Sequence, residues 1–135
     1  MAAVVLIDTD VLIDVARGDV QANSILQVLT EESSPAISVV THMERVVGCR
    51  DKRELAELDR FIKPFQVFNL SQQISESALS LLRQYRLSHG LLIPDALIAA
   101  TAITRNADLL SKNQRDFRYI PDLHLLAYPD RPSVY

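Results

Sequence analysis

Short runs of aliphatic and β-branched residues alternate along this chain with longer segments in which apolar residues recur every three or four positions. The first run, Val4–Ile7, contains no polar residue, which is typical of a strand buried on both faces of a parallel sheet. We expect further strands at about 36–40, 65–70, 109–110 and 124–126. Alternating strands and helices predict an α/β protein with a largely parallel central sheet.

Helices are expected between these strands because apolar residues share one face at helical spacing. A loop at Ser33–Pro35 should separate the second helix from the second strand. The expected helices cover about residues 11–17, 22–29, 41–48, 51–62, 74–89 and 94–103. In the fourth of these, Arg50–Glu54 and Arg53–Glu57 are spaced to form ion pairs on the solvent side.

The chain has 135 residues, which fit one domain, with an expected core at about 4–126 and a C-terminal tail at 127–135. Its net charge of −3 disfavours a protein that binds nucleic acid through a basic surface alone. The single cysteine, Cys49, excludes an internal disulfide and a thiolate zinc site. No segment resembles a membrane span or an export signal, so a cytoplasmic location is expected.

Acidic residues stand where strands pass into helices. Asp8 directly follows the first strand, and ligands of open parallel sheets bind beyond the carboxyl ends of strands. Local roles are also open for these acids. Asp8 or Asp10 could cap the following helix, Thr41 and Glu44 fit a capping box, and Asp95 follows a proline at a helix start.

Asp116 could equally be a turn residue, yet the acids become informative when they are taken together. Two carboxylates about 5 Å apart repel by roughly 3 kcal/mol at an effective dielectric constant of 20. A cluster of them therefore needs protons or a cation. Oxygen ligands of this kind suit Mg²⁺ or Mn²⁺, which would also give an acidic chain affinity for a polyanion.

Four segments of the chain resemble the PIN-domain family, most closely the VapC-type toxin ribonucleases of bacterial toxin–antitoxin pairs. They are Leu6–Asp14, Thr41–Glu44 with Gly48 four residues on, Ile93–Ala102 and Ser111–Phe117. The resemblance extends over about residues 5–126, and the segment around Pro94–Ala102 is its most specific part. It implies a three-layer α/β/α PIN-like domain that uses Mg²⁺ or Mn²⁺ to hydrolyse single-stranded or loop RNA.

The resemblance also implies roles for single residues. Asp8, Glu44 and Asp95 match the three core acids of the family, with Asp8 and Asp95 holding the metal. Many relatives carry Asp where this chain has Asn113, so either Asn113 or the nearby Asp116 completes the cluster. The residues expected to contact the substrate or the water around the metal are Asp10, Ser111, Asn113 and Arg115. The implied partners are the RNA substrate, a VapB-like antitoxin that inserts an arginine near the carboxylates, and a second copy in a homodimer.

Two other classes of function remain as alternatives. Asp8-Thr9-Asp10 after a strand is similar to the start of a haloacid-dehalogenase-like phosphatase, although Leu12 stands where that motif has Thr or Val. A phospho-receiver would need an acceptor Asp after the third strand, where Asn69 stands instead. A catalytically inactive PIN domain that only binds a partner is the other non-enzymatic alternative.

Overall fold

A computed structural model describes residues 4–128 of the chain. Five strands form one sheet in the order β3-β2-β1-β4-β5, and all four pairings are parallel. The strands are β1 (Val4–Ile7), β2 (Ser34–Ser38), β3 (Gln66–Phe68), β4 (Asp108–Leu110) and β5 (Leu125–Leu126). The expected tail residues 129–135 lie outside the described part of the chain.

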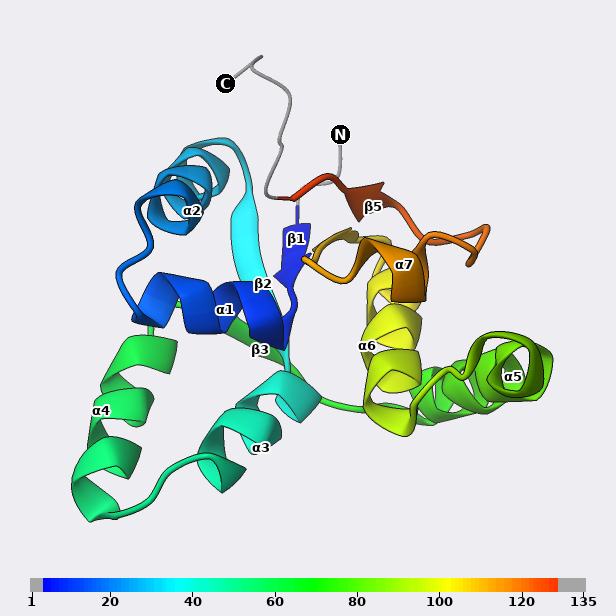
Figure 1. The fold of residues 1–135 in the computed structure, drawn as a ribbon, viewed down its shortest axis with the longest axis horizontal. Coiled ribbons are helices and arrows are strands. Elements are labelled where there is room, and N and C mark those ends of the chain that lie inside the picture. The colour runs from blue at the N-terminus through cyan, green and yellow to red at the C-terminus, as the bar shows by residue number, and fades with distance from the viewer. Residues whose placement is uncertain (1–3, 129–135) are drawn as a thin grey trace.

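Helices cover both faces of the sheet. They are α1 (Thr9–Ala16), α2 (Val20–Glu32), α3 (Val39–Val47), α4 (Lys52–Ile62), α5 (Gln72–His89), α6 (Ile93–Thr104) and α7 (Gln114–Phe117). One layer contains α1, α2 and α4, the other contains α5 and α6, and α3 lies between the two groups at one end of the sheet (Figure 1). This arrangement confirms the predicted three-layer α/β/α fold. No helix within residues 4–128 is both long and apolar enough to cross a membrane.

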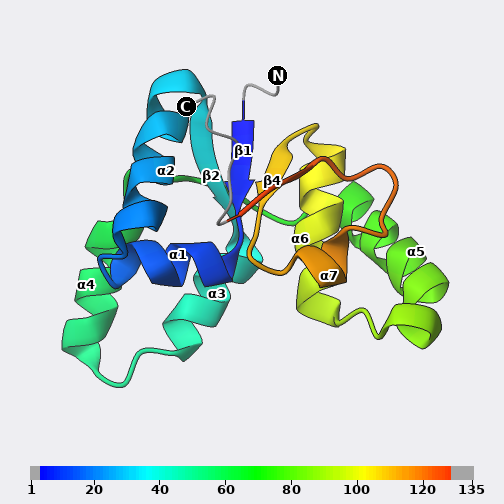
Figure 2. The same ribbon diagram turned by 45° about the horizontal axis from the view of Figure 1, so that its top comes forward.

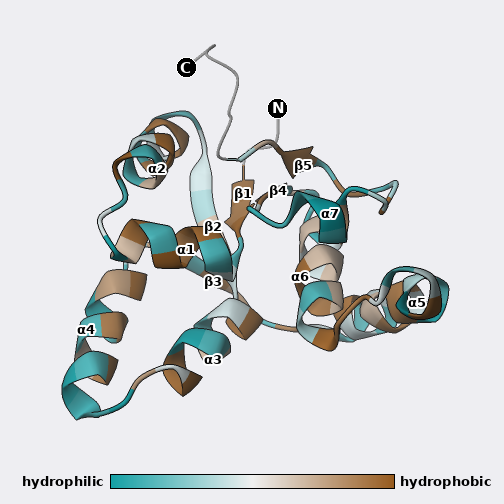
Figure 3. Ribbon diagram, in the orientation of Figure 1, coloured by the Kyte–Doolittle hydropathy of each residue, from teal (hydrophilic) through white to brown (hydrophobic). Residues whose placement is uncertain are grey.

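The first strand is buried on both faces, as its composition predicts. Val5 and Ile7 pack with α1, α2 and α4, whereas Leu6 packs with α5 and α6. On the second face, α6 presents small side chains to the sheet and to α5, and Figure 3 shows its apolar character. Its fully buried alanines are Ala96, Ala99, Ala100 and Ala102.

The boundary between β2 and α3 differs from the predicted one. Ser34 and Pro35 belong to the strand instead of a loop, and Val39 and Val40 belong to the helix instead of the strand. The reason is that Ser38 caps α3, because its side-chain oxygen accepts a hydrogen bond from the backbone N–H of Val40 at 3.0 Å. The strand therefore ends two residues earlier than its β-branched composition suggests.

The strand order reverses its direction of building at β1. From β1 the chain builds outward to β2 and β3, then returns through α5 and α6 to add β4 on the other side of β1 (Figure 2). In open α/β sheets such a reversal separates the connections at the carboxyl ends of the strands, and ligands bind there. The residues after β1 and β4 thus occupy the favoured position for a functional site.

Candidate active site

Asp8 lies at the carboxyl end of β1 and is only 5% exposed. Its Oδ1 accepts a hydrogen bond from the N–H of Thr9 at 2.8 Å, and its Oδ2 accepts one from Ser111 Oγ at 2.7 Å. Of the two candidate caps, Asp8 is therefore the one that caps α1, and the helix begins at Thr9 instead of the expected Val11. Asp10 instead lies in the first turn, and its Oδ1 accepts from the Lys112 N–H at 3.3 Å.

Ser111 connects Asp8 to the segment that follows β4. Ser111 is fully buried, and its hydroxyl donates to Asp8 while accepting from the N–H of Asn113 at 2.9 Å. The Asn113 side-chain amide in turn donates to Asp116 Oδ2 at 2.6 Å. Asn113 and Asp116, which the sequence offered as alternatives, thus belong to one hydrogen-bonded chain, and Asp116 lies in the short helix α7 rather than in a turn.

Glu44 does not form the capping box that its spacing from Thr41 suggests. Since α3 begins at Val39, Thr41 lies inside the helix and is fully buried. The exposed Glu44 instead accepts a hydrogen bond from Thr9 Oγ1 at 2.8 Å, and that hydroxyl also lies 3.1 Å from Thr41 Oγ1. Thr9 therefore joins α3 to the turn that carries Asp8. Sequence reasoning missed Thr9 and Thr41, because their contact spans 32 positions and neither belongs to an acidic motif.

The acids influence one another electrostatically. Burial raises the pKa of Asp8 to about 7, and the charge of Asp10 and then that of Asp95 add to it, against the hydrogen bonds from Ser111 and Thr9. Burial likewise raises the pKa of Asp95 to about 6, with contributions from Asp116, Glu44 and Asp10. Asp95 is half-buried in the first turn of α6. The sheet topology therefore brings the predicted acids of four separate segments into one electrostatic cluster.

Basic side chains flank this cluster. Lys112 Nζ lies 2.9 Å from Asp14 Oδ2, and the Tyr128 hydroxyl donates to the same oxygen at 2.8 Å. Arg115 is exposed and forms no ion pair within residues 4–128, so its guanidinium is available to a bound anion.

The cluster offers carboxylate oxygens, which are the ligand type that hard divalent cations such as Mg²⁺ prefer. Among the described residues, no three His, Cys, Asp or Glu side chains form a group arranged to hold a metal ion. Mg²⁺ does not need such a cage, since it retains several waters and is commonly bound by one or two carboxylates together with substrate phosphate. The desolvated, mutually repelling carboxylates of Asp8 and Asp95 would gain most from such a cation.

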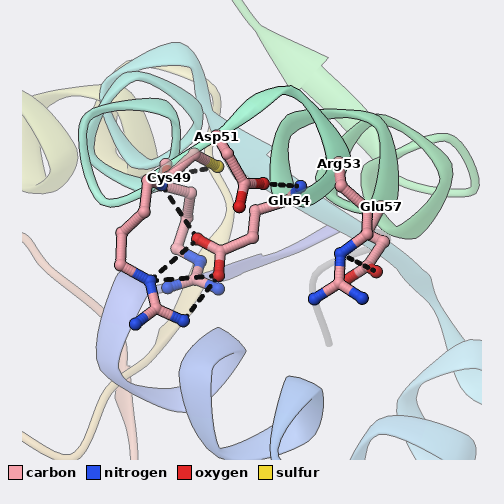
Figure 4. A network of polar contacts seen from close by, with 7 residues as sticks. Cys49, Asp51, Arg53, Glu54 and Glu57 are labelled. Atoms are coloured by element: carbon pink, nitrogen blue, oxygen red, sulfur yellow. Dashed lines mark hydrogen bonds and ion pairs between the residues drawn. The ribbon is translucent and has the colours of Figure 1, made fainter.

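A separate groove of about 830 Å³ lies between α1, α3 and α4. Apolar residues including Ile13, Leu58 and Phe61 line it together with charged side chains of α3 and α4. Figure 4 shows polar contacts of α4 and the loop before it, where Glu54 accepts from Arg50 Nη2 at 2.7 Å and Arg53 Nε lies 3.8 Å from Glu57. Both predicted i,i+4 ion pairs are therefore confirmed.

A family model described as PIN domain matches residues 5–123 of the chain, a range that includes the acids at the carboxyl edge of the sheet. The chain therefore belongs to the PIN-domain family. It is similar to Ribonuclease VapC19 of Mycobacterium tuberculosis, with 38% identity over 120 residues that cover 87% of this chain and 95% of that protein. The family resemblance read from the sequence is thus confirmed.

Solved structures give the same result. A toxin–antitoxin complex from Klebsiella pneumoniae is 32% identical, with a TM-score of 0.77, and the match covers 91% of this chain and 96% of that chain. VapBC2 from Rickettsia felis, bound to a DNA fragment from its promoter, is 26% identical with a TM-score of 0.76, covering 90% and 96%. These matches favour the PIN domain over the phosphatase and receiver alternatives.

The raised pKa values predict how stability depends on pH when no divalent cation is present. Well below pH 3.8, Asp8 and Asp95 are protonated in both folded and unfolded chains. Between 3.8, their ordinary pKa, and about 6 to 7, the folded chain keeps protons that the unfolded chain releases. The contribution of these two carboxyls to the free energy of unfolding should therefore fall as pH rises from 4 to 7, by on the order of a few kcal/mol.

Urea unfolding in EDTA across this pH range measures the effect. Asp8→Asn should remove most of the contribution that this cluster makes to the pH dependence of stability. Asp59→Asn, at an exposed site on α4, should leave that contribution unchanged. The same dependence of stability on pH in both variants, whether rising or falling, would contradict the prediction.

Proposed function

We propose that this chain is a VapC-type endoribonuclease that cleaves single-stranded or loop RNA with Mg²⁺ or Mn²⁺ and acts as the toxin of a toxin–antitoxin pair. The observation that carries the proposal is the electrostatic coupling of Asp8 with Asp10 and Asp95, and of Asp95 with Glu44 and Asp116. A protein gains no stability from such mutual repulsion, so a functional cation is its natural explanation. The similarity to proteins named ribonucleases supports the same reaction.

In this proposal Asp8 and Asp95 hold the cation. When bound, the cation would lower the pKa of water and stabilise negative charge on the phosphate. Ser111 and the N–H of Thr9 fix both oxygens of Asp8, and the Thr9 hydroxyl fixes Glu44. Glu44 and Asp116 would orient the attacking water and accept its proton. Attack by water does not need the RNA 2′-hydroxyl, so the products would carry 5′-phosphate and 3′-hydroxyl ends.

The RNA would be positioned by the cation and by a small number of basic side chains. The net charge of −3 leaves no broad basic surface to neutralise a phosphate backbone. Arg115 and Arg118 are exposed on either side of Asp116 and would contact phosphates next to the cleaved bond. Asp10 and Asn113 would bind waters or a phosphate at the site itself.

The direct test incubates the purified chain with total RNA in Mg²⁺, in Mn²⁺ and in EDTA, followed by mapping of new 5′ ends. We expect cleavage at a small number of positions with either cation, 5′-phosphate products and no cleavage in EDTA. Intact RNA in all conditions would favour the inactive interaction module instead. Cleavage that leaves 2′,3′-cyclic phosphate ends would overturn the mechanism.

We also propose an antitoxin partner. Several solved relatives are toxin–antitoxin complexes, which supports such a partner for this chain. The groove between α1, α3 and α4 is lined by both apolar and charged side chains and would accept an amphipathic segment of that partner. Co-expression with the product of the adjacent reading frame should relieve growth arrest caused by this chain alone. Failure to relieve it would reject that gene product as the antitoxin.

A homodimer is the remaining part of the proposal. Large apolar side chains are exposed on α3 and at the start of α6, including Met43, Val47, Leu92 and Ile93. Figure 3 shows these two segments at the same end of the molecule. Exposed apolar surface of this kind is typical of an interface between subunits.

Sedimentation velocity tests the dimer with a single substitution. Ile93 is 64% exposed, and Ile93→Glu would place a charge in the apolar contact, so we expect the dimer to dissociate into monomers. Val20→Glu is the matched control, because Val20 is 80% exposed on α2, away from α3 and α6. Wild-type protein that sediments as a monomer at tens of micromolar would contradict the proposal.

A further inference from the structure

Three aromatic rings form a contiguous cluster where α5 ends. The rings of His89 and Tyr119 are stacked, with centroids 4.0 Å apart and an interplanar angle of 25°. Tyr85 contacts both, at 4.9 Å from Tyr119 and in an edge-to-face arrangement at 5.8 Å from His89. A hydrogen-bond contact of 2.7 Å between Ser88 Oγ and His89 Nδ1 helps to fix the orientation of the imidazole.

This cluster borders the acidic site. Tyr119 follows Asp116 by three residues, and His89 precedes Asp95 by six, across the short connection from α5 to α6. Burial raises the pKa of Tyr119, and the charges of Asp116 and Asp95 raise it further, so its phenol lies within electrostatic range of both acids. Figures 1 and 2 both show α7, which carries Asp116, beside α6.

Packing of the protein core accounts for only part of the cluster. Tyr85 and Tyr119 are half-buried and pack against the core on the α5–α6 face of the sheet. His89 is not part of that core and is exposed, although one face of its ring rests on Tyr119. The Tyr119 hydroxyl is buried and has no hydrogen-bond partner within residues 4–128. The cluster thus presents an open aromatic surface, supported from beneath, next to the acids.

We propose that His89, supported by Tyr119, is a stacking platform for one unpaired base of the RNA, at a nucleotide close to the cleaved phosphodiester. Stacking of this kind tolerates different sequences, because every base has a π-face. Proteins commonly recognise single-stranded RNA by stacking its splayed bases on aromatic side chains. The platform gives an acidic chain affinity for RNA that does not depend on phosphate contacts. The inference rests on the proposed function, since it assigns a substrate contact to the same site.

Fluorescence anisotropy with a labelled single-stranded RNA tests the platform without cleavage. Ca²⁺ replaces Mg²⁺, and recovery of intact oligonucleotide verifies that no cleavage occurs. His89→Ala should weaken binding about 10-fold, whereas His89→Trp, which restores an aromatic face, should bind at least as tightly as the wild type. His124→Ala is the matched control. The His124 side chain is 75% exposed and pairs with Asp108 at the amino end of β4, whereas the acids lie at the carboxyl ends of the strands.

Abasic substitutions then identify the stacked base. An abasic nucleotide at one position should weaken wild-type binding by a similar factor, and His89→Ala should add no further loss on that RNA. Equal binding by wild type and His89→Ala, or losses that add at every abasic position, would overturn the platform. Absence of any RNA binding by the wild type would do the same. Because this readout needs no cleavage, a protein that binds through His89 but does not cut RNA would refute the nuclease proposal alone.

Discussion

Asp8→Asn is expected to lower cation-dependent RNA cleavage by at least about a thousandfold while leaving the fold intact. A catalytic cation supplies several kcal/mol of transition-state stabilisation, and each 1.4 kcal/mol corresponds to a factor of ten in rate. The asparagine lacks the charge that holds the cation. It retains an oxygen that can accept from the N–H of Thr9, so the cap of α1 is preserved. Initial rates of oligonucleotide cleavage in Mg²⁺ measure the loss.

Asp59→Asn is the matched control for this experiment, because Asp59 is an exposed acid on α4 outside the cluster. Its cleavage rate should equal that of the wild type. Thermal unfolding of Asp8→Asn should verify that the protein is folded at the assay temperature. A folded Asp8→Asn protein with full activity would remove Asp8 from the reaction and, with it, the proposed site.

Phe117→Ala is expected to lower the free energy of unfolding by about 3–5 kcal/mol, the usual cost of removing a large buried aromatic side chain. Phe117 is the largest fully buried side chain of the molecule's described part and belongs to the core formed with α5 and α6. It also anchors α7, which is only four residues long and carries Asp116. Cleavage should therefore decrease together with stability. Urea unfolding monitored by circular dichroism gives the free energy.

Leu87→Ala is the control for side-chain truncation in general. Leu87 is 100% exposed on α5, so its removal should change stability by less than about 0.5 kcal/mol. A loss of similar size in both variants, or a loss under 1 kcal/mol for Phe117→Ala, would contradict the description of α7 as anchored by its phenylalanine.

The sequence predicted the site best where a local pattern has only one structural solution. Val4–Ile7 is a short, wholly apolar run typical of a buried strand, and Asp8 follows it directly, so that Asp8 lies at the carboxyl end of the strand. By contrast, Ser38 and Thr41 both fit the start of a helix, and Val39 and Val40 favour a strand when read alone. The structure selects Ser38 because its hydroxyl caps the helix and Thr41 packs inside.

The contacts that order the acids could not be read from local patterns. Ser111 and Asp8 lie 103 positions apart, and Thr9 and Glu44 lie 35 positions apart. Only the placement of β4 beside β1, and of α3 at the same edge, brings them within hydrogen-bond distance. The acids could be predicted from residue type, because several carboxylates at strand ends are unusual. Serine and threonine at similar positions have many ordinary structural roles, so residue type alone does not reveal their contacts with the acids.

The cluster also implies a cost in stability that function would explain. Asp8 is almost completely buried, and its pKa is raised chiefly by that burial. A neutral isostere would fold without this penalty, so Asp8→Asn should be at least as stable as the wild type in EDTA at neutral pH. Such a gain of stability with loss of activity is typical of residues that serve a site rather than the fold.

Calorimetric titration of the protein with Mn²⁺ tests the central claim most directly, because it measures cation binding without RNA. The wild type and Asp59→Asn should show saturable binding at one or more sites at neutral pH, and both Asp8→Asn and Asp95→Asn should lose the tightest of them. Undetectable binding by the wild type, or equal binding by all four proteins, would contradict the assignment of these carboxylates to a divalent cation.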